Sequence, residues 1–363
     1  MVADSRITFT SQPGDPGETI FSINISKTQY EDDATYLVQI TDACGTGSTQ
    51  PFALRVTPNP PWLRIATDGP PSRASAAMCY DSDRHVTVLF GGATGPNTAA
   101  GYPGAGGYLS DTWQFDGTDW TQRLPVTSPV GRFQANMVYD SARHRTVLFG
   151  GLRYDGTYGF RFSPETWEWD GTNWTQVMTA HLPTWRDWGY PYAACYDSAR
   201  GEMLLFGIFA DPFWAYDGTD WSVKNSGGPG PGYSVNITTT MAFDSNRGVA
   251  VLPGGSGGSL AHYPSLPVWE WDGTVWHERP QSGQQPGLSG GNVMTYDKFR
   301  QECVLFGEVD GMVDGQQTSF LYPKPDFDRY VWRWNGQQWQ ADPPTPTLGV
   351  SANQLHSDRK SVV

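Results

Sequence analysis

The most regular feature of the sequence is a pattern of short apolar runs and polar turns that occurs five times. In each copy one apolar run ends at an aspartate, and a second apolar run begins a few residues later. Two further runs, both carrying tryptophan, flank an Asp-Gly or Asn-Gly turn. The aspartates are separated by 59, 57, 47 and 53 residues, at Asp81, Asp140, Asp197, Asp244 and Asp297. A self-similar period of this length indicates a repeat architecture.

Each copy predicts four strands rather than helices. In the first copy the runs are Ala76–Tyr80, Val86–Phe90, Thr112–Phe115 and a run that begins at Trp120. They are rich in β-branched and aromatic residues, too short for helices, and bounded by turn residues. Four antiparallel strands per repeat, stacked around an axis, form a β-propeller. The sequence therefore predicts an all-β fold.

Several features of the copies resemble the kelch repeat. They are a double glycine after the second strand (Gly91-Gly92, Gly150-Gly151, Gly254-Gly255), a tryptophan in the third strand and a tryptophan in the fourth. The resemblance covers roughly residues 61–342 and implies a kelch-like propeller of the galactose-oxidase-like superfamily. The third and fifth copies depart from it, with Gly207-Ile208 and Gly307-Glu308. Copper radical oxidases of that superfamily need a Tyr-His pair, which does not occur here, so we expect no copper site.

The sequence divides into two parts, residues 1–57 and residues 58–363. The first part resembles the last strands of a bacterial immunoglobulin-like domain, and Asp33–Tyr36 is similar to the tyrosine corner of that fold. This part is too short to bury a sandwich core by itself. We expect the chain to be a segment of a modular protein that is secreted or exposed on a bacterial surface. No signal peptide is visible in it.

Both ends of the second part contain fragments of a further repeat. Trp62–Ile65 matches a fourth strand, and Ser357–Val363 aligns with Ser82–Val88. We expect a ring of six blades whose last blade combines strands from both termini, with Phe52–Val56 lending a third strand. Such closure removes free sheet edges. The alternative is a ring of five blades with two frayed ends.

Composition excludes some partners. The net charge is −13, which disfavours nucleic acid and anionic membranes. No apolar run reaches the 18 residues of a membrane-spanning candidate. The four cysteines lack disulfide or metal-ligand spacing, and Cys79 and Cys195, which share one first-strand position, are predicted to be buried thiols. We expect a monomer.

Most of the 16 tryptophans occupy equivalent repeat positions, which indicates packing between blades. Trp185 and Trp188 are the exceptions, and they share one variable connection with Arg186 and Tyr190. Planar aromatic rings beside charged groups suit a glycan or similar polar ligand. The alternative is that these rings plug their own loop. We expect the long connections to gather on one rim, where function usually lies, and the short uniform turns on the other.

Three arginines precede first strands at similar offsets, namely Arg73, Arg132 and Arg186. Converging guanidinium groups could hold a ligand carboxylate or phosphate by paired hydrogen bonds. The alternative is a structural role within the repeat. The sequence does not decide between them.

Besides ligand binding, the sequence leaves open a hydrolase, which is a second possible function, and a structural repeat; a calcium ion could accompany any of them. A hydrolase acting on glycosidic or ester bonds would draw its catalytic groups from polar residues of the variable connections, namely His181, Asp187, His262, Glu308 and Asp310. Carboxylates in the glycine-containing loop around Asp310 and Asp314 could bind calcium. A structural or adhesive repeat without a small-molecule site is the third possibility. Ligand binding is the function that the sequence favours.

Overall fold

A computed structural model gives the structure of the chain, which divides into two compact units, Met1–Leu63 and Arg64–Val363. The structure describes residues 7–13, 19–25, 34–36, 39–42, 45–48, 52–54, 68–94, 107–154, 160–183, 192–207, 212–224, 231, 240–253, 267–280, 286, 293–307, 312–313, 316–317 and 330–341.

The first unit contains three antiparallel strand pairs in its described part. They are β1 (Ile7–Pro13) with β2 (Thr19–Ile25), β3 (Ala34–Tyr36) with β6 (Phe52–Leu54), and β4 (Gln39–Asp42) with β5 (Gly45–Ser48). The pairing of β6 with β3 corrects the expectation that Phe52–Val56 lends a strand to the propeller. A partner nearby in the sequence requires a shorter loop to be closed and therefore costs less entropy.

The second unit contains five four-stranded antiparallel sheets within the described residues, and we number them as blades in chain order. Blade 1 consists of β7 (Ala77–Asp81), β8 (Val86–Phe90), β9 (Thr112–Phe115) and β10 (Trp120–Arg123). Blade 2 consists of β11 (Asn136–Asp140), β12 (Arg145–Phe149), β15 (Thr166–Trp169) and β16 (Trp174–Val177). Blade 3 consists of β17 (Ala193–Asp197), β18 (Glu202–Phe206), β19 (Trp214–Tyr216) and β20 (Trp221–Val223). Blade 4 consists of β21 (Ala242–Asp244), β22 (Val249–Leu252), β23 (Val268–Trp271) and β24 (Trp276–Arg279), and blade 5 of β25 (Val293–Asp297), β26 (Glu302–Gly307), β29 (Tyr330–Trp334) and β30 (Trp339–Ala341).

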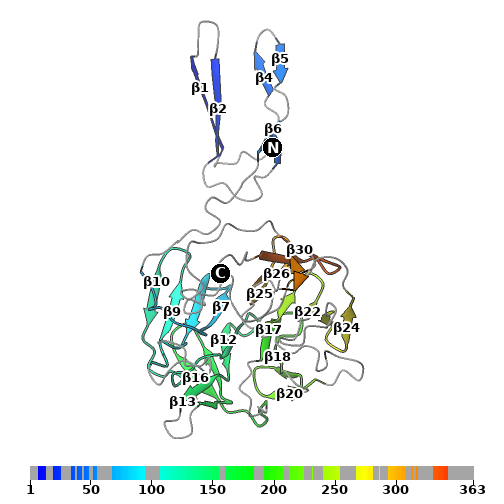
Figure 1. The fold of residues 1–363 in the computed structure, drawn as a ribbon. Helices are drawn as coiled ribbons and strands as arrows, with labels where there is room; N and C mark the ends of the chain where they lie inside the picture. The colour runs from blue at the N-terminus through cyan, green and yellow to red at the C-terminus, as the bar shows by residue number, and fades with distance from the viewer. Residues whose placement is uncertain are drawn as a thin grey trace. The chain divides into compact units, whose positions relative to one another are not determined.

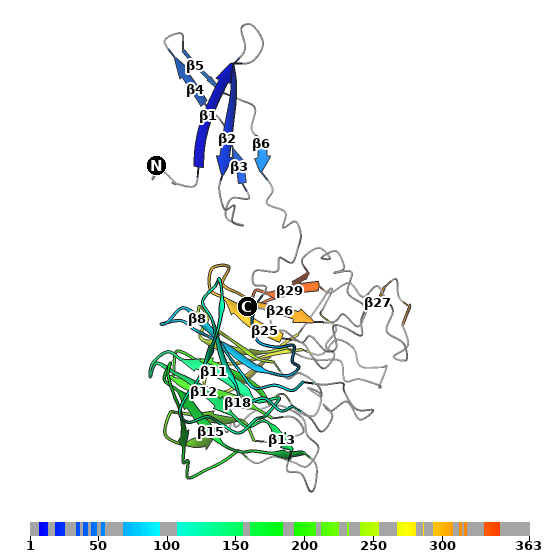
Figure 2. The ribbon, with the colours of Figure 1, turned by 90° about the vertical axis from the view of Figure 1, so that its left-hand side faces the viewer.

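The blades follow one another as in a β-propeller (Figures 1 and 2). The first strands β7, β11, β17, β21 and β25 lie next to one another in this order. The all-β propeller is therefore confirmed, and the described part matches the five-blade alternative. The fragments predicted for a sixth blade, Trp62–Ile65 and Ser357–Val363, lie outside the described residues. No helix occurs in the described ranges, so none there could span a membrane.

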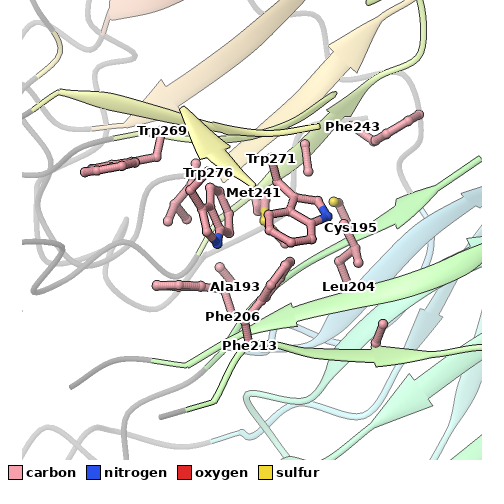
Figure 3. Packing of buried hydrophobic residues seen from close by; sticks show 13 residues of the cluster. Ala193, Cys195, Leu204, Phe206, Phe213, Met241, Phe243, Trp269, Trp271 and Trp276 are labelled. Carbon is pink, nitrogen blue, oxygen red and sulfur yellow. The ribbon is translucent and has the colours of Figure 1, made fainter. Parts of the chain in front are cut away.

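Aromatic side chains fill the interfaces between blades. In each of the first three interfaces a second-strand phenylalanine meets the fourth-strand tryptophan of the next blade, with ring centroids 4.6–5.5 Å apart (Phe90–Trp174, Phe149–Trp221, Phe206–Trp276). Figure 3 shows this packing between blades 3 and 4, where Phe213 also lies against Trp271. The repeat-position tryptophans of blades 2–5 are buried, as predicted, whereas Trp113 and Trp120 of blade 1 are half-buried.

The recurring aspartates organise the turns between first and second strands. Asp140 Oδ1 accepts the backbone N–H groups of Ala142 and Arg143, both at 3.0 Å, while Oδ2 accepts Arg143 Nε at 2.7 Å. The same arrangement recurs at Asp81, Asp197, Asp244 and Asp297. A buried carboxylate is stable here because its oxygens receive several hydrogen bonds. These aspartates are structural.

The arginines of the first three such turns also donate to the Asp-Gly turn of the next blade. Arg84 Nη2 donates to Asp170 O at 2.5 Å, and Arg143 Nη1 donates to Gly218 O at 3.2 Å. The short turns therefore lie on one rim, which we call the uniform rim. Gly218 has φ +99° and lies so close to Arg143 that an added Cβ would be 2.3 Å from the guanidinium. The turn thus needs glycine both for its conformation and for this contact.

The opposite, variable rim carries the connections between second and third strands and the residues just before the first strands. Backbone bonds join these two sets, for example Gly92 N to Arg132 O at 2.8 Å and Leu152 N to Phe133 O at 2.8 Å. The connection in blade 2 includes a ribbon of β13 (Leu152–Tyr154) and β14 (Phe160–Phe162), and the blade 5 connection includes β27 (Met312–Val313) and β28 (Gln316–Gln317). Both were expected as loops.

In their described parts, the connections from blade 1 to blade 2 and from blade 2 to blade 3 do not lie wholly on the variable rim, and this corrects the prediction for these two. They first pass the Asp-Gly turn of the following blade, where Thr127 N donates to Asn173 Oδ1 at 2.8 Å. They then end on the variable rim at residues such as Arg132. Strand twist accumulates from the first to the fourth strand of a blade. The fourth strand is therefore tilted, and the chain that leaves it runs toward the next blade and not along the rim.

Candidate functional site

The variable rim of blade 1 is organised by Arg73, whose residue exposure is only 4%. Arg73 Nη1 and Nη2 bind Asp111 Oδ1 and Oδ2 at 2.6 and 2.9 Å. Two further N–H groups, on Nη1 and Nε, donate to Gly91 O and Pro71 O, both at 3.0 Å. Asp111 Oδ2 also accepts Trp113 Nε1 at 2.6 Å. A guanidinium and an indole N–H therefore share one carboxylate.

Blade 2 repeats this arrangement with a longer acidic side chain. Arg132 Nη2 donates to Glu165 Oε2 at 2.6 Å, and Nη1 donates to Gly150 O at 3.1 Å. Trp167 Nε1 donates to the same Glu165 Oε2 at 3.0 Å. Arg132 is 1% exposed, so nearly all of its surface is inside the protein.

The electrostatics of these two clusters favour the charged carboxylates. Partial burial alone would raise the pKa of Glu165, but the bonds from Arg132 and Trp167 outweigh it and hold that pKa below its ordinary value. The pKa of Asp111 is lowered in the same way, against partial burial, by Arg73 and Trp113. Burial lowers the pKa of the Arg132 guanidinium, while Glu165 opposes this shift.

Arg73 and Arg132 thus have partners within the chain. The sequence offered them as holders of a ligand carboxylate, and each binds a carboxylate of its own blade. Each arginine also joins the residues before a first strand to the glycine that follows the second strand. This arrangement stabilises the shape of the rim, as the structural alternative for these residues requires.

Blade 3 has no acidic residue at the repeat position of Asp111 and Glu165, and Asp211, one residue earlier, lies outside the described residues. Pro212 stands two residues before the third-strand Trp214, at the place of Asp111 and Glu165. Trp214 is 8% exposed, and its Nε1 is buried without a hydrogen-bond acceptor. Arg186 stands eleven residues before Asp197, whereas Arg73 and Arg132 stand eight residues before their aspartates. Within the described residues, the indole N–H groups of Trp169 and Trp271 are also buried without an acceptor. What distinguishes Trp214 is therefore the comparison with Trp113 and Trp167 at the same repeat position, whose indoles donate to a carboxylate.

The aromatic connection of residues 184–191 leads to Tyr192, which is described. Tyr192 is 2% exposed, and its ring lies 6.4 Å from Phe149 and 6.2 Å from Phe162. Phe162 belongs to β14 in the variable-rim connection of blade 2. The connection therefore ends on the variable rim, between blades 2 and 3. Several candidate residues lie outside the described residues, namely Trp185, Arg186, Asp187, Trp188, Tyr190, His262, Glu308, Asp310 and Asp314.

The structure places His181 at the turn between β19 and β20. Its backbone N–H and its Nδ1 contact Asp220 Oδ1 and Oδ2 at 2.9 and 2.7 Å. These contacts lower the pKa of Asp220 to about 2. The His181 side chain is 70% exposed. His181 lies there because the connection from blade 2 to blade 3 passes the Asp-Gly turn of blade 3. It does not lie beside Arg132. The described ranges contain no group of three or more metal-ligating side chains.

Three of the four cysteines are described, and all three are free thiols. Cys195 is buried, as predicted, whereas Cys79, for which the same was predicted, is half-buried; Cys303 is buried as well. Burial raises the pKa of the Cys79 thiol to about 12 and raises those of Cys195 and Cys303 as well. Thiols with raised pKa values are poor nucleophiles.

No protein-family model matches the chain, and no curated protein matches it. A solved structure titled "Structure of YjhT" is similar over 66% of this chain and 74% of its own, with 13% sequence identity and a TM-score of 0.44.

Sequence reasoning found the arginines but missed their partners. Asp111, Glu165 and the unpaired N–H of Trp214 emerge only from the structure. A signal was present, because an acidic residue stands two positions before the third-strand tryptophan in the first two copies and Pro212, Pro267 and Tyr330 replace it in the others.

Proposed function

We propose that this protein is a ligand-binding propeller that holds a glycan or similar polar ligand on the variable rim, at blade 3. The observation that carries the proposal is the unpaired Trp214 Nε1–H. In blades 1 and 2 the equivalent indole donates to a carboxylate oxygen of the chain. An oxygen of a bound ligand would take this place at blade 3.

Energetic reasoning supports this assignment. Leaving a buried donor unsatisfied costs about 1–3 kcal/mol, and a ligand oxygen would recover that energy on binding. The equivalent indole N–H groups of blades 1 and 2 already have acceptors, so a hydrogen bond to a ligand would gain less free energy there. Blade 3 is therefore the preferred position among the first three.

The sequence of the neighbouring connection supports a polar, ring-shaped ligand. Trp185, Trp188 and Tyr190 offer three aromatic rings within six residues, together with Arg186 and Asp187. Aromatic faces stack on the apolar faces of sugar rings, and charged groups bind hydroxyl or carboxyl oxygens. Because the chain carries a net charge of −13, a polyanion would be repelled, whereas a neutral or weakly acidic glycan would not.

Calorimetric titration against neutral and uronic-acid oligosaccharides tests the proposal. We expect Trp185→Ala to weaken binding by about 1–3 kcal/mol, the loss typical of one aromatic stacking contact. Met178→Ala is the matched control, because Met178 is 84% exposed in the same inter-blade connection. The proposal is wrong if no oligosaccharide binds, or if both variants bind as the unchanged protein does.

A further inference from the structure

Neighbouring blades are joined by tyrosines of their first strands. Tyr139 OH of blade 2 donates to Asp83 Oδ2 of blade 1 at 2.7 Å. Tyr196 OH of blade 3 donates to Asp140 Oδ1 of blade 2 at 2.6 Å. In both interfaces the tyrosine faces back to the preceding blade. The acceptor is either the aspartate that ends that blade's first strand, as Asp140 does, or the aspartate two residues later in the turn, as Asp83 is.

Blade 1 has the same tyrosine without the same neighbour. Tyr80 occupies the position of Tyr139 and Tyr196, yet it is 49% exposed. The one contact of its hydroxyl in the described part is with His85 Nδ1 of its own turn, at 3.3 Å. Nothing described lies within 4 Å of a Cβ added at Gly117, whereas the equivalent Gly218 lies against Arg143 of the preceding blade.

The free side of blade 5 shows the complementary gap. Val293 and Thr295 of β25 are exposed, while Ala193 and Cys195 at the same positions of blade 3 are buried. The Asp297 side chain is 18% exposed, whereas those of the four other turn aspartates are 0–2% exposed. Blades 5 and 1 therefore do not cover each other as the four successive pairs do.

We infer that residues 356–363 of this chain dock on the Tyr80 face of blade 1 and supply the missing neighbour. Ser357-Asp358-Arg359 repeats Ser82-Asp83-Arg84, so Asp358 stands where Asp83 accepts the hydroxyl of Tyr139. Tyr80 then donates to Asp358 in the same way. Among the five described turns only the first has aspartate at this position, where Ala142, Ala199, Asn246 and Phe299 stand in the others.

Residues 356–359 differ from residues 81–84 at one position, so the inference concerns only the hydrogen bond between Tyr80 and Asp358. His356 stands where the other turns have the aspartate that binds the arginine. Arg359 therefore lacks the carboxylate that holds Arg84 at 2.7 Å from Asp81. In the equivalent interface Tyr139 donates to Asp83 at 2.7 Å, and Asp81 also interacts with its hydroxyl. Where His356 replaces the first aspartate, Asp358 is therefore the carboxylate left to accept the Tyr80 hydroxyl.

A double-mutant cycle on the full chain tests the docking. Tyr80→Phe is combined with Asp358→Ala, and urea unfolding is measured for all four proteins at two protein concentrations tenfold apart. The same cycle with Tyr139→Phe and Asp83→Ala serves as the reference, because it measures the coupling free energy of an equivalent pair that is in contact in the structure. We expect Tyr80→Phe to lower the unfolding midpoint by about 0.3 M and to have no further effect once Asp358 is replaced.

Additive effects of the two substitutions would overturn the inference, because the side chains would then not interact. Coupling that grows with protein concentration would also overturn it, since the occupant would be a second copy of the chain. Coupling that is equal at both concentrations is the result that the intramolecular contact requires.

Discussion

Replacing Trp167 or Trp214 with phenylalanine compares the loss of an indole N–H that has a hydrogen-bond acceptor with the loss of one that has none. The two tryptophans occupy the same repeat position and are 7% and 8% exposed, so both substitutions remove the same ring atoms from similar surroundings. Trp167→Phe also removes the 3.0 Å bond to Glu165 Oε2, whereas Trp214→Phe removes a buried N–H without an acceptor. Hydrogen bonds to charged groups contribute about 1.5–3 kcal/mol, and the 24% exposure of the Glu165 side chain reduces this value.

We therefore expect Trp167→Phe to lower the free energy of unfolding by about 1–2 kcal/mol more than Trp214→Phe. Urea unfolding followed by far-ultraviolet circular dichroism measures both values under identical conditions. Trp113→Phe should behave like Trp167→Phe, because Trp113 Nε1 binds Asp111 at 2.6 Å. Equal losses for Trp167→Phe and Trp214→Phe, or a larger loss for Trp214→Phe, would refute the reasoning.

Two further predictions concern the stability of the blades. Thr166→Val leaves the buried Trp221 Nε1 without its 2.9 Å acceptor and should cost about 1–3 kcal/mol in urea unfolding, whereas Val in place of the exposed Thr175 should change the value by less than about 0.5 kcal/mol. The folded pKa of Glu165 is lowered, so its contribution to stability is full above the unfolded pKa of about 4.3 and is lost as pH falls below it. Unfolding measured between pH 6 and pH 3 should therefore show a smaller loss of stability for Glu165→Gln than for the unchanged chain, and an equal loss would contradict the shift.

The sequence was sufficient to predict the repeat and its buried positions. Asp81 and its four equivalents mark the turns because a carboxylate there satisfies several donors. The tryptophans of blades 2–5 fall at fixed positions because they pack against the neighbouring blade. Such features depend on local spacing, which a single chain displays directly.

The remaining features depend on contacts between distant residues. Arg132 and Glu165 are 33 positions apart, and only the strand order brings them together. The path of the inter-blade connections also escaped prediction, because it follows from accumulated strand twist rather than from a local pattern. For this reason His181 lies beside Asp220 and away from the arginines of the variable rim. The pairing of Phe52–Leu54 with Ala34–Tyr36 was missed for the same kind of reason.

The most direct test of ligand binding at blade 3 is the indole region of a ¹H–¹⁵N correlation spectrum. Substitution by phenylalanine assigns the signals of Trp113, Trp167 and Trp214, and neutral and uronic-acid oligosaccharides are then titrated into the labelled protein. The account predicts that the Trp214 signal moves with the saturation of binding, while the Trp113 and Trp167 signals stay, because their protons already have acceptors. Binding that leaves the Trp214 signal unchanged would contradict it.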